Sequence, residues 1–267
     1  MKTASTAVGA VFERCRAEGR AALIAFLTAG FPSLEISREL VGALCENGAD
    51  IIELGFPYSD PLADGPTIQA ASHRALDNGA TFDRILDMCK ELRVSAPLLA
   101  FSYYNPLFVR GPAEVAAEFA ACGFAGAVIP DLPIEEADPL LDAFASRGLS
   151  LAFLVAPTTP LERARAIAQR CTDFVYVVSR MGVTGVQAGM GPDLAQRLAE
   201  LRSVTAKPLA IGFGISKAEQ VHEIAQMADG IIVGSAFIDA ANGPKSVESV
   251  GKLCAALRRA TQKVKVL

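Results

Sequence analysis

Eight apolar runs of strand length, with helical patterns between them, constrain the fold of this chain more than any other feature. The runs cover residues 23–30, 51–56, 97–104, 126–133, 150–159, 174–180, 208–216 and 230–236. Near-continuous apolar strands separated by helices are typical of a parallel sheet that helices cover. Eight such units in about 250 residues fit a closed (β/α)8 TIM barrel better than an open doubly wound sheet. No GxGxxG motif follows the first run, which also favours the barrel.

Two further helices are predicted outside the repeating units. Residues 6–17 carry a helical pattern before the first strand, and residues 68–76 fill the longer gap between the second and third strands. No linker or low-complexity segment divides the chain. We therefore expect one TIM-barrel domain over residues 1–267.

Composition excludes several classes of protein. The net charge is −4 and no basic run is present, so a nucleic-acid-binding surface is not expected. No apolar stretch approaches the roughly 20 residues of a membrane helix, and the first residues do not resemble a signal peptide, so a cytoplasmic protein is expected. The six cysteines are scattered singly and only His73 and His222 could join them, so we expect reduced core thiols and no metal site.

Residues 51–69, IIELGFPYSDPLADGPTIQ, place carboxylates where a barrel keeps its chemistry. Glu53 interrupts an apolar strand, and Asp60 and Asp64 follow in the loop after it. No lysine or histidine stands at a strand end, so carboxylates must carry any proton transfer. For Glu53 the alternative is a structural ion pair, with Arg180 as the candidate at a neighbouring strand end. For Asp60 the simpler interpretation, a turn residue before a proline, is preferred.

Glycine-rich turns after the sixth, seventh and eighth strands predict a phosphate site. The turns contain GVTG at 182–185, GFGIS at 212–216 and GSA at 234–236. Backbone without side chains can approach a phosphate closely, and this is the usual phosphate position in a TIM barrel. Any one turn could be only a tight connection, but the three together favour a phosphorylated substrate.

The stretch from Glu53 to Gln69 closely resembles the signature of the tryptophan synthase alpha chain family. The similarity extends, in the family's order, to FLTAG at 26–30, YNP at 104–106, PDLP at 130–133, SRMGVTG at 179–185 and the last two glycine turns. It covers nearly the whole chain. The acidic motif is highly specific, whereas the glycine motifs alone would fit many phosphate-binding barrels.

The resemblance implies a reaction and a set of roles. Members of the family cleave indole-3-glycerol phosphate to indole and glyceraldehyde 3-phosphate by a retro-aldol reaction. Glu53 matches the catalytic glutamate, whose pKa an apolar strand should raise, and Asp64, in a more polar loop, matches the aspartate that binds the ring N–H. The residues expected to bind substrate are Phe26, Tyr103, Tyr176, Thr184, Gly185, Gly214, Gly234 and Ser235. For the three aromatic residues, packing in the cavity wall is the alternative.

The loop over residues 181–192 is glycine-rich and suits a lid that closes over the site, from which Thr184 would orient Asp64; an unconstrained surface loop is the alternative. The resemblance also implies a partner, a pyridoxal-phosphate-dependent beta chain in an α2β2 heterotetramer, with Asn105 and Asp131 at the interface. For Asp131, turn chemistry is the alternative. This chain has no suitable lysine for that cofactor, and none is expected in it.

Three other functions stay open. A different phosphate-binding barrel would want a lysine at a strand end, which is absent. A non-catalytic activator of a partner has no need for a buried acid, so Glu53 and Asp64 argue against it. A free-standing indole-releasing lyase shares the site with the subunit, and the sequence does not separate the two.

Overall fold

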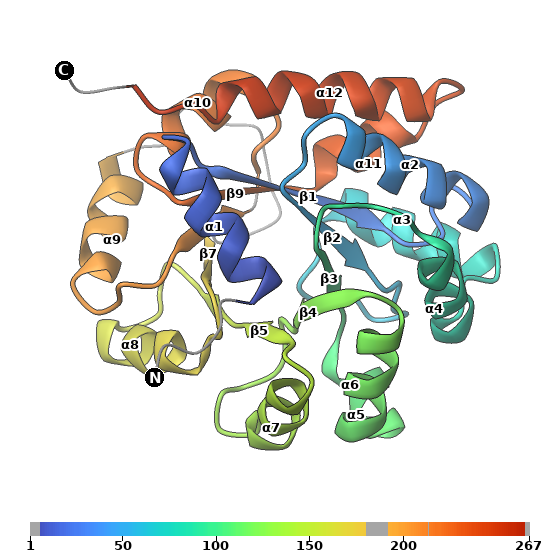
Figure 1. Cartoon of the computed structure of the whole chain (residues 1–267), viewed down its shortest axis with the longest axis horizontal. Coiled ribbons are helices and arrows are strands. Elements are labelled where there is room, and N and C mark those ends of the chain that lie inside the picture. The colour runs from blue at the N-terminus through green and yellow to red at the C-terminus, as the bar shows by residue number, and fades with distance from the viewer. Residues whose placement is uncertain (1–5, 180–191, 213, 265–267) are drawn as a thin grey trace.

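A single parallel sheet lies at the centre of the molecule, wrapped by helices (Figure 1). The computed structural model of the chain describes residues 6–179, 192–212 and 214–264. In that part of the chain the strands are β1 Ala22–Thr28, β2 Ile51–Gly55, β3 Leu98–Phe101, β4 Phe124–Val128, β5 Ser150–Ala152, β6 Leu154–Val155, β7 Val175–Val178, β8 Leu209–Gly212 and β9 Gly230–Val233. Their order is β5-β4-β3-β2-β1-β9-β8-β7-β6, so the first strand lies between the second and the last.

The sheet closes into a barrel through Phe153. β5 and β6 stand at opposite ends of the strand order, yet only this residue separates them in the chain. They are the two halves of the predicted fifth strand, one paired with β4 and the other with β7. The Phe153 N–H points to Cys171 Sγ at 3.4 Å instead of to a neighbouring strand, which interrupts the ladder. The predicted (β/α)8 barrel is confirmed, with its fifth strand split.

Helices form the outer layer of the barrel. In the described residues they are α1 Ala7–Ala17, α2 Leu34–Glu46, α3 Pro66–Asp77, α4 Phe82–Glu91, α5 Tyr104–Arg110, α6 Pro112–Ala121, α7 Asp138–Ser146, α8 Leu161–Arg170, α9 Pro192–Arg202, α10 Ala218–Ala225, α11 Ser235–Ala241 and α12 Ser246–Ala260. The N-terminal helix and the extra helix after the second strand are both confirmed as α1 and α3. None of these helices is long and apolar enough to cross a membrane.

The third predicted strand was too long at its carboxyl end. β3 stops at Phe101, and Tyr104, predicted to end the strand, is the first residue of α5. The apolar pattern continues past the strand because Tyr103 and Leu107 are also buried, although they belong to the loop and the new helix. A proline in the first helical turn, here Pro106, suits a helix start better than a strand.

The register of the parallel ladders places specific side chains inside the barrel. Phe26 pairs with Glu53, and Glu53 pairs with Leu99 on the next strand. Partners in a parallel ladder share a face of the sheet, so these three side chains form one layer. The layer nearer the carboxyl ends of the strands contains Thr28, Gly55 and Phe101. Every residue of β1 and β2 is buried.

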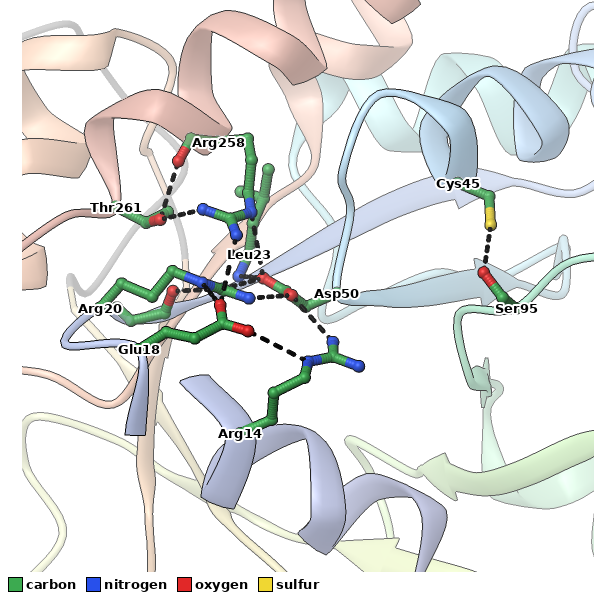
Figure 2. Close-up of polar contacts among 10 residues, drawn as sticks. Arg14, Glu18, Arg20, Leu23, Cys45, Asp50, Ser95, Arg258 and Thr261 are labelled. Atoms are coloured by element: carbon green, nitrogen blue, oxygen red, sulfur yellow. Dashed lines mark hydrogen bonds and ion pairs between the residues drawn. The ribbon is translucent and has the colours of Figure 1, made fainter. Parts of the chain in front are cut away.

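A buried ion pair fastens the opposite, amino-terminal ends of β1 and β2 (Figure 2). Arg20 donates from both terminal nitrogens to Asp50, at 2.6 and 2.7 Å, and the Leu23 N–H donates to the same carboxylate at 2.9 Å. Arg14 from α1 and Arg258 from α12 add weaker contacts at 3.1 and 3.8 Å. Burial alone would raise the pKa of Asp50, but the Arg20 and Leu23 hydrogen bonds outweigh it and lower that pKa.

Replacing Asp50 by asparagine should strongly destabilise the fold, because it removes the buried counter-charge of Arg20 and leaves that guanidinium only the solvent-exposed Glu18. Removing one partner of a buried pair costs about 3–5 kcal/mol of unfolding free energy. Urea denaturation at pH 7 measures the loss. Glu91→Gln is the matched control, since Glu91 pairs with Arg38 on the surface and should change stability little. Equal stabilities for the two variants would contradict this role for Asp50.

Candidate active site

Glu53 lies in the middle of β2 and is 1% exposed. Burial, and then the negative charge of Asp64, raise its pKa to about 8. Its Oε1 has no hydrogen-bond partner, and no arginine pairs with it, among the described residues. The structural ion-pair alternative therefore finds no support there, and its candidate Arg180 lies outside the described residues. A carboxyl group in this environment is protonated near neutral pH and can serve as an acid.

Asp64 lies in the loop between β2 and α3 and is more buried than the polar loop around it suggests. The side chain is 6% exposed. Burial raises its pKa to about 6, although a hydrogen bond from Tyr103 acts in the opposite direction. The sequence placed Asp64 in a polar loop, and the structure buries its side chain there because a hydrogen bond from the distant Tyr103 holds it.

Two side chains hold that loop in place. The Tyr103 hydroxyl donates to Asp64 Oδ2 at 3.2 Å and accepts the Ala63 N–H at 2.8 Å. The Gln69 amide donates to the Asp64 carbonyl oxygen at 2.9 Å. The ring of Tyr58 stacks on Tyr103 with centroids 5.0 Å apart. Tyr58 and Gln69 had no predicted role, and their only signal in the sequence was their place in the long acidic motif.

Phe26 and Tyr176 are buried aromatic side chains, and each occupies space that a glycine on a neighbouring strand leaves free. Phe26 packs edge-to-face on Phe101 with ring centroids 5.6 Å apart, and a Cβ atom at Gly55 would come within 2.6 Å of the Phe26 ring. The missing side chain at Gly55 therefore makes room for the ring. Similarly, a Cβ atom at Gly212 would come within 2.5 Å of the Tyr176 hydroxyl.

Tyr176 on β7 faces the two carboxyl groups across the barrel. Burial raises its pKa, and the charges of Glu53 and Asp64 raise it further, so the hydroxyl lies within the electrostatic reach of both. The structure thus brings together four of the predicted residues: Glu53, Asp64, Tyr103 and Tyr176.

The predicted phosphate residues are only partly described. Gly214 has a φ of 77°, which favours glycine, and Gly234 precedes α11 and lies against Phe26 and Ile68. Ser235 is the first residue of α11. Thr184 and Gly185 lie outside the described residues. The predicted lid at 181–192 does too, except for its last residue.

The predicted partner residues lie on the surface around the start of α5. Asn105 is exposed in the first turn, and the exposed Asp131 accepts the Tyr104 N–H at 2.8 Å. Asp60 is exposed and accepts a hydrogen bond from Ser59 at 2.7 Å, which supports its turn interpretation. His73 and His222 are exposed on helices. All six cysteines are free, and the described residues contain no His, Cys, Asp and Glu cluster that could hold a metal ion.

Comparisons with known proteins point to one family. The model of the tryptophan synthase alpha chain family matches residues 12–265. A tryptophan synthase alpha chain from Synechococcus elongatus is 47% identical over 265 residues, covering 98% of this chain and 99% of the relative. One from Synechocystis is 50% identical over 235 residues, covering 87% and 89%.

Solved structures agree with the sequence relatives. A chain of tryptophan synthase from Mycobacterium tuberculosis superposes with a TM-score of 0.90 at 36% identity, covering 97% of this chain and 99% of that one. Tryptophan synthase subunit alpha from Legionella pneumophila gives a TM-score of 0.87 at 31% identity, covering 97% and 99%.

Glu53→Gln should stabilise the protein at alkaline pH. A carboxyl group has a pKa of about 4.3 in an unfolded chain. The folded value is about 8, so the wild type loses stability as pH rises between the two. The variant cannot ionise at this position, and its advantage should grow across that window. Urea denaturation from about pH 5 to pH 9 tests the sign. Glu39→Gln, at an exposed position on α2, is the control, and parallel curves for wild type and Glu53→Gln would contradict the raised pKa.

Proposed function

This chain belongs to the tryptophan synthase alpha chain family and is a lyase that cleaves indole-3-glycerol phosphate, and from that premise we propose that Glu53 and Asp64 are its catalytic pair. One observation carries the assignment. Two carboxyl groups are buried within reach of each other, since the charge of Asp64 acts on Glu53, and their environments raise the pKa to about 8 for Glu53 and to about 6 for Asp64. Two acids with separated pKa values can divide the work of an acid and of a charge stabiliser.

Glu53 supplies and recovers the proton. Protonated near neutral pH, it donates to the ring carbon that bears the glycerol phosphate chain. As a carboxylate it then takes the proton of the side-chain hydroxyl while the C–C bond breaks. Asp64 accepts a hydrogen bond from the ring N–H and stabilises the positive charge that forms on the ring. Tyr103 holds the Asp64 carboxylate in position through its 3.2 Å hydrogen bond.

The remaining contacts complete the substrate site in this proposal. Phe26, Tyr103 and Tyr176 enclose the indole end, and the phosphate binds at the backbone of Gly185, Gly214, Gly234 and Ser235. Thr184 orients Asp64 from the lid. The whole chain, residues 1–267, acts as one domain in the cytoplasm.

Glu53→Gln should lower indole release by at least about 100-fold, the usual contribution of a general acid–base group. The assay measures indole from indole-3-glycerol phosphate with the purified chain, at pH 7. Glu39→Gln is the control for charge removal outside the site. A Glu53→Gln enzyme of near wild-type rate would refute the assignment. A wild type that makes no indole, even with a beta chain, would instead favour the activator function.

We also propose that the chain docks on a pyridoxal-phosphate-dependent beta chain in an α2β2 heterotetramer. Exposed apolar side chains support a protein interface at α5. Phe108 is 64% and Val109 is 78% exposed, a few residues after Asn105. Large apolar side chains left together in solvent mark interaction sites, whereas scattered ones do not. Asp131 bonds the start of the same helix.

Val109→Asp should abolish the rise in indole release that a beta chain produces, with the rate of the isolated chain unchanged. Val264→Asp is the matched control, because Val264 is similarly exposed, at 65%, but lies at the far end of the chain from α5. Titration of each variant with a beta chain gives the result. Full stimulation of the Val109→Asp variant would place the interface elsewhere. A fast isolated wild type with no stimulation at all would favour the free-standing lyase.

A further inference from the structure

Thr28 ends β1 with a buried hydroxyl group that no group in the described part of the chain satisfies. The residue is 1% exposed, and its Oγ1 has no hydrogen-bond partner among residues 6–179, 192–212 and 214–264. Buried hydroxyl groups almost always find a partner, because an unsatisfied one loses its hydrogen bonds to water without compensation. The other buried oxygen without a partner in this part of the chain is Glu53 Oε1.

The strand register places these two oxygens on the same face of neighbouring strands. Phe26 pairs with Glu53, and Thr28 pairs with Gly55. Side chains two residues apart on a strand share a face, so Thr28 faces the barrel interior as Glu53 does. Thr28 stands one layer nearer the carboxyl ends of the strands, where barrel enzymes hold their substrates.

The separation suits a small group held between them. Neighbouring strands lie about 4.8 Å apart, and two residues advance a strand by about 6.6 Å, so the two Cα atoms are about 8 Å apart. The Glu53 side chain covers part of that distance. One hydroxyl group with two hydrogen bonds of about 2.8 Å can bridge the rest.

We propose that Thr28 is a substrate-contacting residue whose hydroxyl donates a hydrogen bond to the side-chain hydroxyl oxygen of the substrate, the oxygen that becomes the aldehyde oxygen of the product. The inference rests on the proposed function of Glu53. The substrate hydroxyl then satisfies both orphan atoms at once, because it donates to the Glu53 carboxylate and accepts from Thr28.

The contact acts where charge develops in the cleavage. After Glu53 has protonated the ring carbon, its carboxylate removes the proton of the substrate hydroxyl. The electrons of that O–H bond form the aldehyde C=O, the C–C bond to the ring breaks, and its electron pair neutralises the positive ring nitrogen. Partial negative charge develops on the hydroxyl oxygen as its proton leaves. A hydrogen-bond donor fixed beside that oxygen lowers the activation free energy of the step.

Thr28→Val tests the role, since valine keeps the shape and removes the hydroxyl. We expect kcat/KM for indole release to fall by about 10- to 100-fold, mainly through kcat. The melting temperature should stay the same or rise, because an unsatisfied buried hydroxyl is lost. Thr28→Ser keeps the hydroxyl and should restore most of the rate.

Thr261→Val is the matched control. Thr261 is equally buried, but its hydroxyl donates to the Arg258 carbonyl oxygen at 2.8 Å (Figure 2). Its own carbonyl oxygen accepts the Ala21 N–H just before β1, at the opposite end of the barrel from the site. That variant should melt at a lower temperature with kcat/KM unchanged.

Two outcomes would overturn the inference: wild-type kcat/KM in Thr28→Val, or a Thr28→Val protein that melts lower while Thr28→Ser is equally slow. Both are distinct from failure of the proposed function, which would show as an inactive wild type or a fully active Glu53→Gln enzyme.

Discussion

The pairing of β1 with both β2 and β9 is the interaction on which the rest of the structure depends. It closes the first and last strands of the chain against each other and places Phe26 between Glu53 and the Gly234 turn. Without that closure the interior would be an exposed sheet face, and Glu53 would be solvated. The raised pKa of Glu53 is therefore a property of the closed barrel, because burial is its main cause.

Asp50 and Glu53 show how one strand can carry two carboxyl groups in opposite charge states. Both are almost fully buried, just before and within β2. Asp50 meets Arg20 and the Leu23 N–H, and its pKa falls. Glu53 meets no cation among the described residues, and its pKa rises to about 8. The amino-terminal end of the barrel satisfies its charge and adds stability, while the middle of β2 holds an acid that no described residue pairs with and that is free for chemistry.

The sequence predicts the barrel well because each strand coincides with a local apolar run. It singles out Glu53 as a candidate site residue because a charge interrupts such a run. It fails where a contact joins distant residues. Tyr103 buries Asp64 from 39 positions away, and Arg20 meets Asp50 from 30 positions away, so no local pattern reveals either. The end of β3 was missed for a related reason, since buried loop and helix residues continue the apolar pattern of a strand. The break at Phe153 was missed because Phe153 is itself apolar and buried.

The proposed partner surface and the candidate site share one structural element. Tyr103 immediately precedes α5, and its hydroxyl bonds Asp64. The first residue of that helix, Tyr104, bonds Asp131, and its last turns expose Phe108 and Val109. A protein that docks on α5 therefore presses on the helix whose N-cap residue positions Asp64. Because both proposed catalytic carboxyl groups come from this chain, such a partner would have only to adjust the geometry of Asp64, and it need not supply a reacting group.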